Sequence, residues 1–201
     1  MREEGLGKER AIGFSDGVFA IAITLLILNV QVPELPSESS SELDRAFDHV
    51  LPDLLSYFIG FYVIGKFWLG HHRLFGALDA VDDGMLNANL FYLSTIALLP
   101  FPTGVLGEHA ELTSGVVAFA AAVALAGFAE TWLLRLSHRK RLLGPDWVAR
   151  RRADFYEALS VPVVFLLSIP IAFASPDAAK YFWLSLIAVR VGGSRLGLMP
   201  A

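Results

Sequence analysis

Polar side chains at the ends of apolar segments are the residues of this sequence best suited to chemistry. The carboxylate of Asp16 stands near the start of the apolar run FSDGVFAIAITLLILNV, residues 14–30. A charged side chain inside a bilayer is costly, so Asp16 requires a paired partner, a water-filled neighbour or a place at the membrane edge. The other polar candidates at helix ends are Ser15, His71, His72 and Asn89.

Helical geometry excludes Arg10 as the partner of Asp16. The two residues are six positions apart, which places them about 120° out of phase on a helix. The same spacing puts Asp16 about 9 Å beyond Arg10 along the axis, near the headgroup boundary. We therefore expect Asp16 to find its partner on another helix, in a polar cluster of the groups at the same level, which are His71, His72, Arg73, Asn87 and Asn89. Three roles are open to such a cluster: it holds the helices together, it handles ions directly, or it relays protons.

A stripe of bulky aliphatic side chains runs along the same segment. With Ile21 at zero on a helical wheel, Leu25 lies at about 40° and Leu28 at about 340°, with Thr24 beside them at about 300°. The stripe is either a packing face, with the Thr24 hydroxyl bonded back to its own helix, or the lining of a pore that closes by dewetting. The residues alone favour packing, because apolar stripes on membrane helices are common.

The composition requires a membrane to position these residues. Of the 201 residues, 55% are hydrophobic and 18% are charged, and the mean hydropathy is +0.54, far too apolar for a soluble domain of this size. A bilayer core of about 30 Å needs about 20 apolar residues per helix. We predict an all-α integral membrane protein, a single domain over residues 1–201 with six spans at 11–31, 51–70, 85–106, 112–136, 155–174 and 178–192.

The distribution of charge orients these spans. The connection 136–154 holds six Lys and Arg residues, so the positive-inside rule places it and both termini in the cytoplasm of a multi-pass cell (inner) membrane protein. An alternative role for the basic stretch 135–152 is binding of anionic lipid, although a topology determinant is favoured. There is no global basic field that would favour nucleic acid as a partner.

Catalytic and metal-dependent functions find little support. The chain has no cysteine, which excludes disulfides and thiolate metal sites. Adjacent histidines such as His71 and His72 are about 100° apart on a helix and poorly placed to share a metal. No convergent catalytic set is visible, so we expect no enzyme activity, no bound metal and no cofactor.

Three motifs resemble one family of channels. Arg10-x-x-x-Phe14-Ser15-Asp16, leading into GVFAIAITLLIL, resembles the signature of the transmembrane protein 175 family, the endolysosomal potassium channels and their bacterial relatives. FWLGHHRLF (67–75) and NLFYLSTIALLPFPT (89–103) are similar to that family's second and third helices. The likeness covers the first half of the chain, and Lys66, inside the second span, departs from the pattern.

The resemblance implies a homotetramer in the lipid bilayer, with the first helix of each subunit around a central pore. It implies a cation channel with potassium as the permeant ion, weakly selective over sodium. The implied gate is Ile21, Leu25 and Leu28, the implied selectivity residue is Thr24, and the implied motif and polar network is Arg10, Phe14, Ser15, Asp16, His71, His72 and Asn89. A secondary transporter or a proton-permeable cation pathway is the alternative.

Overall fold

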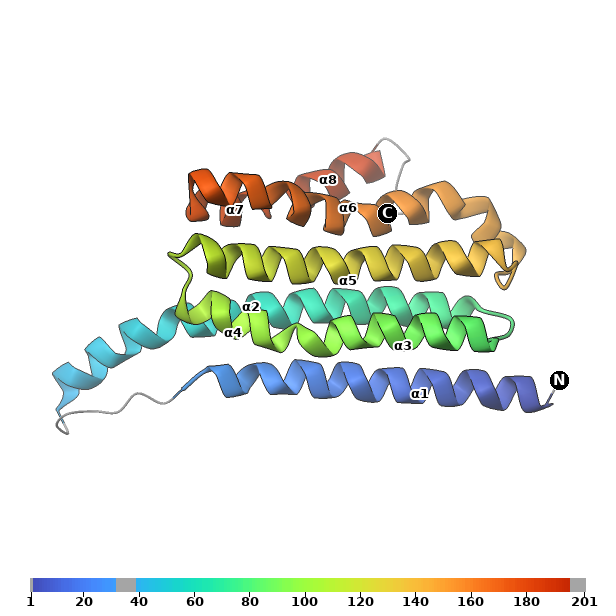
Figure 1. The fold of residues 1–201 in the computed structure, drawn as a ribbon, viewed down its shortest axis with the longest axis horizontal. Helices are drawn as coiled ribbons and strands as arrows, with labels where there is room; N and C mark the ends of the chain where they lie inside the picture. The colour runs from blue at the N-terminus through green and yellow to red at the C-terminus, as the bar shows by residue number, and fades with distance from the viewer. Residues whose placement is uncertain (1, 32–38, 196–201) are drawn as a thin grey trace.

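Helices make up the fold throughout the part of the chain that the computed structural model describes, residues 2–31 and 39–195 (Figure 1). The all-α prediction is confirmed. The elements are α1 (Arg2–Leu25), a 3₁₀ turn η1 (Leu26–Asn29), α2 (Ser40–Ala77), α3 (Asp83–Leu98), α4 (Pro100–Glu108), α5 (Thr113–Arg139), α6 (Pro145–Ala174), α7 (Pro176–Phe182) and α8 (Ser185–Arg195).

Five helical segments are long and apolar enough to cross a membrane. They are Gly7–Asn29, Val50–Ala77, Asp83–Glu108, Thr113–Arg139 and Arg152–Ala174, and they correspond to the first five predicted spans. The sixth predicted span, 178–192, is divided between α7 and α8, which have 7 and 11 residues. Helices of these lengths reach about 10 and 16 Å, well short of a bilayer core of about 30 Å, so a sixth spanning helix is not confirmed.

The prolines of the third span divide it into α3 and α4, and local hydrogen bonds bridge the break at Leu99. Pro100 and Pro102 lack the amide hydrogens that would continue the helical ladder. The Leu99 amide donates to the Ile96 carbonyl at 3.1 Å, and the Thr103 hydroxyl donates to the Leu99 carbonyl at 2.8 Å. These bonds keep the bent segment viable in an apolar environment.

The helices lie nearly antiparallel in a layered bundle (Figure 1). Helix α1 lies along one side, against α2 and α3; α5 lies in the middle between α3 and α6; α7 and α8 pack beside α6 on the other side. The start of α1, the α2–α3 connection and the α5–α6 connection meet at one end, which we call the basic end after Arg139, Lys140 and Arg141.

Contacts between two connections fix the basic end. The Asp79 amide donates to the Leu142 carbonyl at 2.9 Å. The Asp82 carboxylate caps α3 by accepting from the Met85 amide at 2.8 Å, and it pairs with Lys140. The hydrogen bond from Lys140 and the capped amide together hold the pKa of Asp82 below its usual range. The α2–α3 and α5–α6 connections are therefore joined at this end of the bundle.

Candidate functional site

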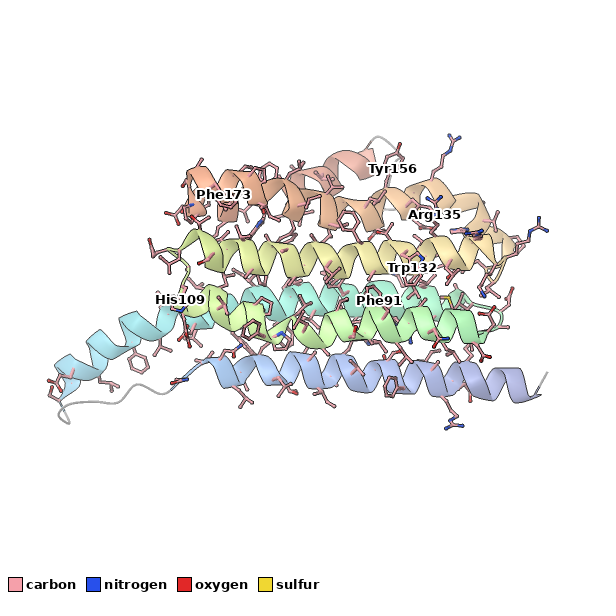
Figure 2. The ribbon with its side chains drawn as sticks, in the orientation of Figure 1. Phe91, His109, Trp132, Arg135, Tyr156 and Phe173 are labelled. Carbon is pink, nitrogen blue, oxygen red and sulfur yellow. The ribbon has the colours of Figure 1, made fainter. Side chains whose placement is uncertain are left out.

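Helix α1 has two faces with different surroundings. Its inner face is buried against the bundle, continues into Leu26 of η1, and consists of Ala11, Ser15, Phe19 and Ala22. The predicted stripe lies on another face: Ile21 is 61% exposed, Leu25 42% and Leu28 70%. Figure 2 shows α1 at the edge of the bundle, with side chains projecting away from it. Among the described residues, the stripe is therefore largely left out of the packing.

Thr24 lies on the exposed side of α1, next to the stripe. Its hydroxyl group lies 2.9 Å from the Ala20 carbonyl and 3.0 Å from the Ile21 carbonyl, so it donates back to its own helix. That geometry matches the structural alternative for Thr24. It also leaves the hydroxyl oxygen with lone pairs that point away from the helix backbone and remain available as an acceptor.

A buried chain of hydrogen bonds joins α1, α2 and α3. His71 Nε2 lies 2.9 Å from Asn89 Oδ1, the Asn89 amide donates to Ser15 Oγ at 3.0 Å, and the Ser15 hydroxyl donates to the Ala11 carbonyl at 2.7 Å. Because an amide oxygen only accepts, His71 Nε2 carries the hydrogen in this arrangement. The structure thus brings Ser15, His71 and Asn89 together. The chain ends on a backbone carbonyl, which cannot pass on a proton, and this favours a structural contact over a proton relay.

Aromatic rings fix the orientation of His71. Its ring stacks on Phe75 with the centroids 4.1 Å apart and on Tyr92 at 5.8 Å, and Phe19 of α1 lies 5.6 Å away. His71 is 1% exposed. The ring is held from several sides, so its Nε2–H is aimed at Asn89.

Asp16 has a partner that the sequence analysis did not name. Its carboxylate accepts a hydrogen bond from the indole Nε1 of Trp68 at 2.8 Å, and the Trp68 ring lies 5.4 Å from the exposed ring of His72. This hydrogen bond was not among the expected contacts, although its donor does lie on another helix, and Asp16 is also within electrostatic range of His71. An indole N–H in a membrane helix needs an acceptor, and this rule would have identified Trp68.

The first residues of the motif lie outside these networks. Phe14 is 57% exposed. Arg10 is exposed, and its side chain makes no hydrogen bond or ion pair within the described ranges. The exposed positions of Arg10 and Phe14 place them on the same side of α1 as the aliphatic stripe.

Two further sets of contacts hold α1 against its neighbours, and neither was predicted from the sequence. At the basic end, Lys8 donates to the Gly76 carbonyl at 3.1 Å and to the carbonyl of Leu78, the residue that follows α2. At the opposite end, the side-chain amide of Asn29 donates to the Pro100 carbonyl of α4 at 2.9 Å. All three bonds connect residues about 70 positions apart in the chain. Helix α1 is thus fastened near both of its ends, and its stripe faces outward between them.

Comparisons with known proteins place this chain among ion channels. The family model described as "Endosomal/lysosomal potassium channel TMEM175" matches residues 10–100. A relative named potassium channel, from a Chryseobacterium species, is 30% identical over 176 residues, 88% of each chain. A second potassium channel, from Streptomyces collinus, is 40% identical over 109 residues, and the match covers 54% of this chain but only 50% of that relative. The mouse endosomal/lysosomal proton channel TMEM175 is 28% identical over 147 residues, which cover 72% of this chain and 29% of the mouse protein.

The fold has a counterpart among solved structures. The crystal structure of a lysosomal potassium-selective channel TMEM175 homolog from Chamaesiphon minutus matches with a TM-score of 0.77 at 24% identity, covering 92% of this chain and 97% of that chain. At this identity the match supports the fold alone. The extended sequence identity to the Chryseobacterium relative, together with the family-model match over residues 10–100, shows that the chain belongs to the TMEM175 family of ion channels.

Proposed function

We propose that this protein is a potassium-permeable cation channel in which four copies of α1 surround a central pore. The observation that carries the proposal is the position of Ile21, Leu25 and Leu28, which are 61%, 42% and 70% exposed on a helix whose inner face is packed in the bundle. A helix fastened near both ends, with its aliphatic stripe facing outward, is suited to meet copies of itself around an axis. Relatives named potassium channels support potassium as the permeant ion.

The proposed gate acts through hydration. A ring of branched aliphatic side chains offers a cation no ligands, so a narrow ring excludes water and blocks the pore. Widening the ring by movement of α1 readmits water and a hydrated or partly hydrated ion. Potassium sheds water more readily than sodium, so the proposed pore has a weak preference for potassium over sodium. The Thr24 hydroxyl oxygen replaces part of the lost hydration, because its hydrogen is already used toward the helix backbone.

In the proposed orientation the basic end faces the cytoplasm of the cell (inner) membrane, with both termini on that side. The cations Arg139, Lys140 and Arg141 at that end support this assignment through the positive-inside rule. Ser15, Asp16, His71, His72 and Asn89 then lie near the cytoplasmic half of the pore helix. We assign to these polar residues the role of holding α1 in register with α2 and α3. The proposed channel conducts potassium and uses no cofactor.

The test is to make the constriction easier to hydrate. Ile21→Asn should raise basal potassium flux severalfold in reconstituted vesicles, because a polar ring lowers the cost of wetting the neck. Ile27→Asn is the matched control, since Ile27 is 49% exposed on the same segment but lies about 240° around the helix from Ile21. Equal flux in the two variants, with the oligomer intact, would remove Ile21 from the pore. Native mass spectrometry of the same preparations should give four subunits.

Proton permeation is the second candidate function. The vertebrate relatives in mouse and human are named proton channels, whereas the bacterial relatives are named potassium channels. Planar-bilayer recording under separate potassium, sodium and proton gradients measures each permeability through its reversal potential. Unitary currents distinguish a channel from a secondary transporter, which would give saturable coupled flux without single-channel steps.

A further inference from the structure

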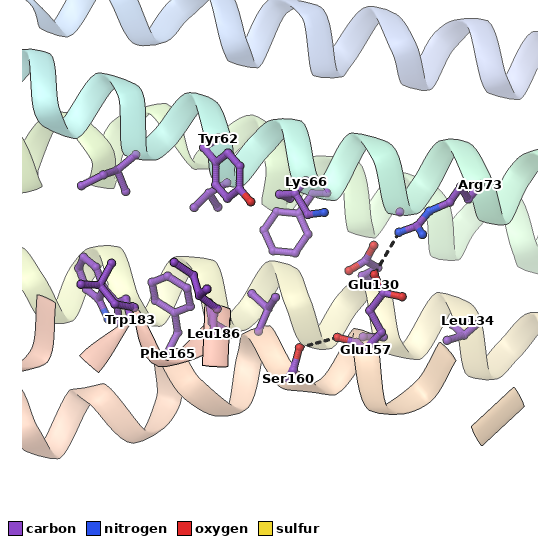
Figure 3. Close-up of a pocket in the computed structure, with 18 of the residues that line it drawn as sticks. Tyr62, Lys66, Arg73, Glu130, Leu134, Glu157, Ser160, Phe165, Trp183 and Leu186 are labelled. Carbon is purple, nitrogen blue, oxygen red and sulfur yellow. Dashed lines mark hydrogen bonds and ion pairs between the residues drawn. The ribbon is translucent and has the colours of Figure 1, made fainter. Parts of the chain in front are cut away.

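A cavity of about 580 Å³ lies on the side of the bundle away from α1 (Figure 3). Residues of α2, α5, α6, α7 and α8 line it, together with Trp183 and Leu184 between α7 and α8, and its walls are largely aromatic and aliphatic. Its volume falls within the range of about 300–1,000 Å³ that is usual for ligand pockets. The apolar lining residues relevant here are Phe58, Tyr62, Phe67, Leu134, Phe165 and Trp183.

Charged side chains enter the cavity toward the basic end. Arg73 of α2 pairs with Glu157 of α6 at 3.3 Å, and its side chain is still 51% exposed. Arg73 Nε also donates to the Leu69 carbonyl at 3.3 Å. A guanidinium group has five N–H donors, so Arg73 keeps donors for a further acceptor. Arg73 lies four residues before the end of its span, about 6 Å from the membrane boundary.

A second acid lies deeper in the same half of the cavity. Glu130 of α5 occupies space that Gly70 leaves open on α2: a Cβ atom at Gly70 would lie 2.0 Å from Glu130 Oε1. Glu130 is within electrostatic range of Glu157, Arg73 and Lys66, and Figure 3 shows the Glu130, Arg73 and Glu157 side chains close together. At the far end Lys180 also lines the cavity, but it is bound to Asp177 at 2.7 Å and to the Ala110 carbonyl at 3.0 Å.

We propose that this cavity binds one phospholipid of the leaflet at the basic end, with its phosphate at Arg73 and one acyl tail along the aromatic wall. Helices α2 and α6 are both candidate spans, and Phe58 and Tyr62 are 63% and 67% exposed beside the cavity. The medium that meets them in a membrane is therefore lipid. Arg73, Asp154 and Glu157 line the cavity near the membrane boundary, Lys66 lies part-way along it, and the remaining wall is largely aromatic and aliphatic. Polar groups are thus concentrated toward the boundary, as they are in a phospholipid. The proposal does not depend on the pore.

The dimensions of α6 fit a tail from one leaflet. The indole Nε1 of Trp183 donates to Ser168 Oγ at 2.9 Å, so Trp183 lies at the level of Ser168. Ser168 follows Glu157 by eleven residues, about 16 Å along the helix axis, and half of the hydrocarbon core is about 15 Å. A tail that starts near the Arg73–Glu157 pair therefore ends close to Trp183. Arg139 and Arg141, which are exposed at the same end, favour anionic headgroups.

Brominated phospholipids test this placement, because bromine quenches tryptophan fluorescence on contact. Trp183 is only 8% exposed, so lipid at the outer surface does not reach it. The full-length protein is reconstituted in vesicles of phosphatidylglycerol brominated either near the methyl end or near the carbonyl end of the tail. The Trp183 signal is the difference between wild-type protein and Trp183→Phe. We expect strong quenching by bromine near the methyl end and weak quenching by bromine near the carbonyl.

Two pairs of variants identify the site. Ala158→Phe fills the cavity and should abolish the quenching of Trp183, whereas Ala121→Phe, on an exposed position of α5, should leave it unchanged. In titrations of brominated into unbrominated lipid, Arg73→Gln should weaken apparent affinity about fivefold, the effect of one cation near an anionic surface. Arg135→Gln, another exposed arginine, is its control.

Three results would overturn the proposal. Unquenched Trp183 in folded wild-type protein means that no tail enters, as when a neighbouring subunit covers the opening. Stronger quenching by bromine near the carbonyl means that lipid enters from the opposite leaflet. Equal loss of quenching in the Ala158 and Ala121 variants means that the signal comes from surface lipid and not from the cavity.

Discussion

Replacing Asn89 by leucine should destabilise the protein by about 1–3 kcal/mol, because it leaves the His71 Nε2–H buried without an acceptor. Asn89 is 2% exposed and His71 is 1% exposed, so water does not reach the orphaned donor. The loss at Ser15 adds little, since its hydroxyl still donates to the Ala11 carbonyl at 2.7 Å. Asn87→Leu is the matched control: Asn87 is an exposed residue of the same helix, and its replacement should change stability by less than about 0.5 kcal/mol.

A double-mutant cycle tests whether the pairing itself is responsible. His71→Phe removes the donor and retains a ring that fits between Phe75 and Tyr92. As a single substitution it leaves the side-chain oxygen of Asn89 unpaired. With both partners apolar, the penalty should largely vanish, so the double variant should be more stable than the sum of the single effects by about 1–3 kcal/mol. The free energy of unfolding is measured by reversible unfolding in mixed detergent micelles. Additive effects, within about 0.3 kcal/mol, would refute the reasoning.

Two further predictions concern α1 and the α5–α6 contact. Asp16→Ala should destabilise the oligomer by about 1.5 kcal/mol, because it removes a hydrogen bond to a charged group, and it should change ion selectivity little. Asp16→Asn keeps an acceptor for the indole N–H and should retain most of the stability. A stable oligomer with altered permeability would contradict this role. Gly127→Ala should destabilise the protein by about 1–3 kcal/mol, because the new Cβ would lie 2.7 Å from the rigid Pro162 ring. Gly65→Ala is the control, since its new Cβ would meet open space. Equal melting temperatures for the two variants would show that α5 and α6 shift apart freely.

Hydropathy and periodicity were sufficient for much of the fold. A bilayer demands about 20 apolar residues per helix, so spans are visible in the sequence without tertiary information, and five of them correspond to helical segments long and apolar enough to cross. The sixth is not confirmed, because apolar composition between 178 and 192 does not show where a helix is interrupted. The division at Trp183 and Leu184 depends on how α7 and α8 pack against α6.

In the candidate site too, some features followed from the sequence and others only from the tertiary structure. The angular separation of Ile21 from Ser15 on α1 follows from helix geometry, so the sequence alone determined that an aliphatic stripe and a polar contact occupy different faces. Whether the stripe closes a pore stays a prediction. Only the tertiary structure decided that Asp16 bonds to Trp68 and that a charged cavity opens beside Arg73. Both depend on how far each helix is rotated about its own axis relative to its neighbours, and the periodicity of a single helix carries no information about that rotation.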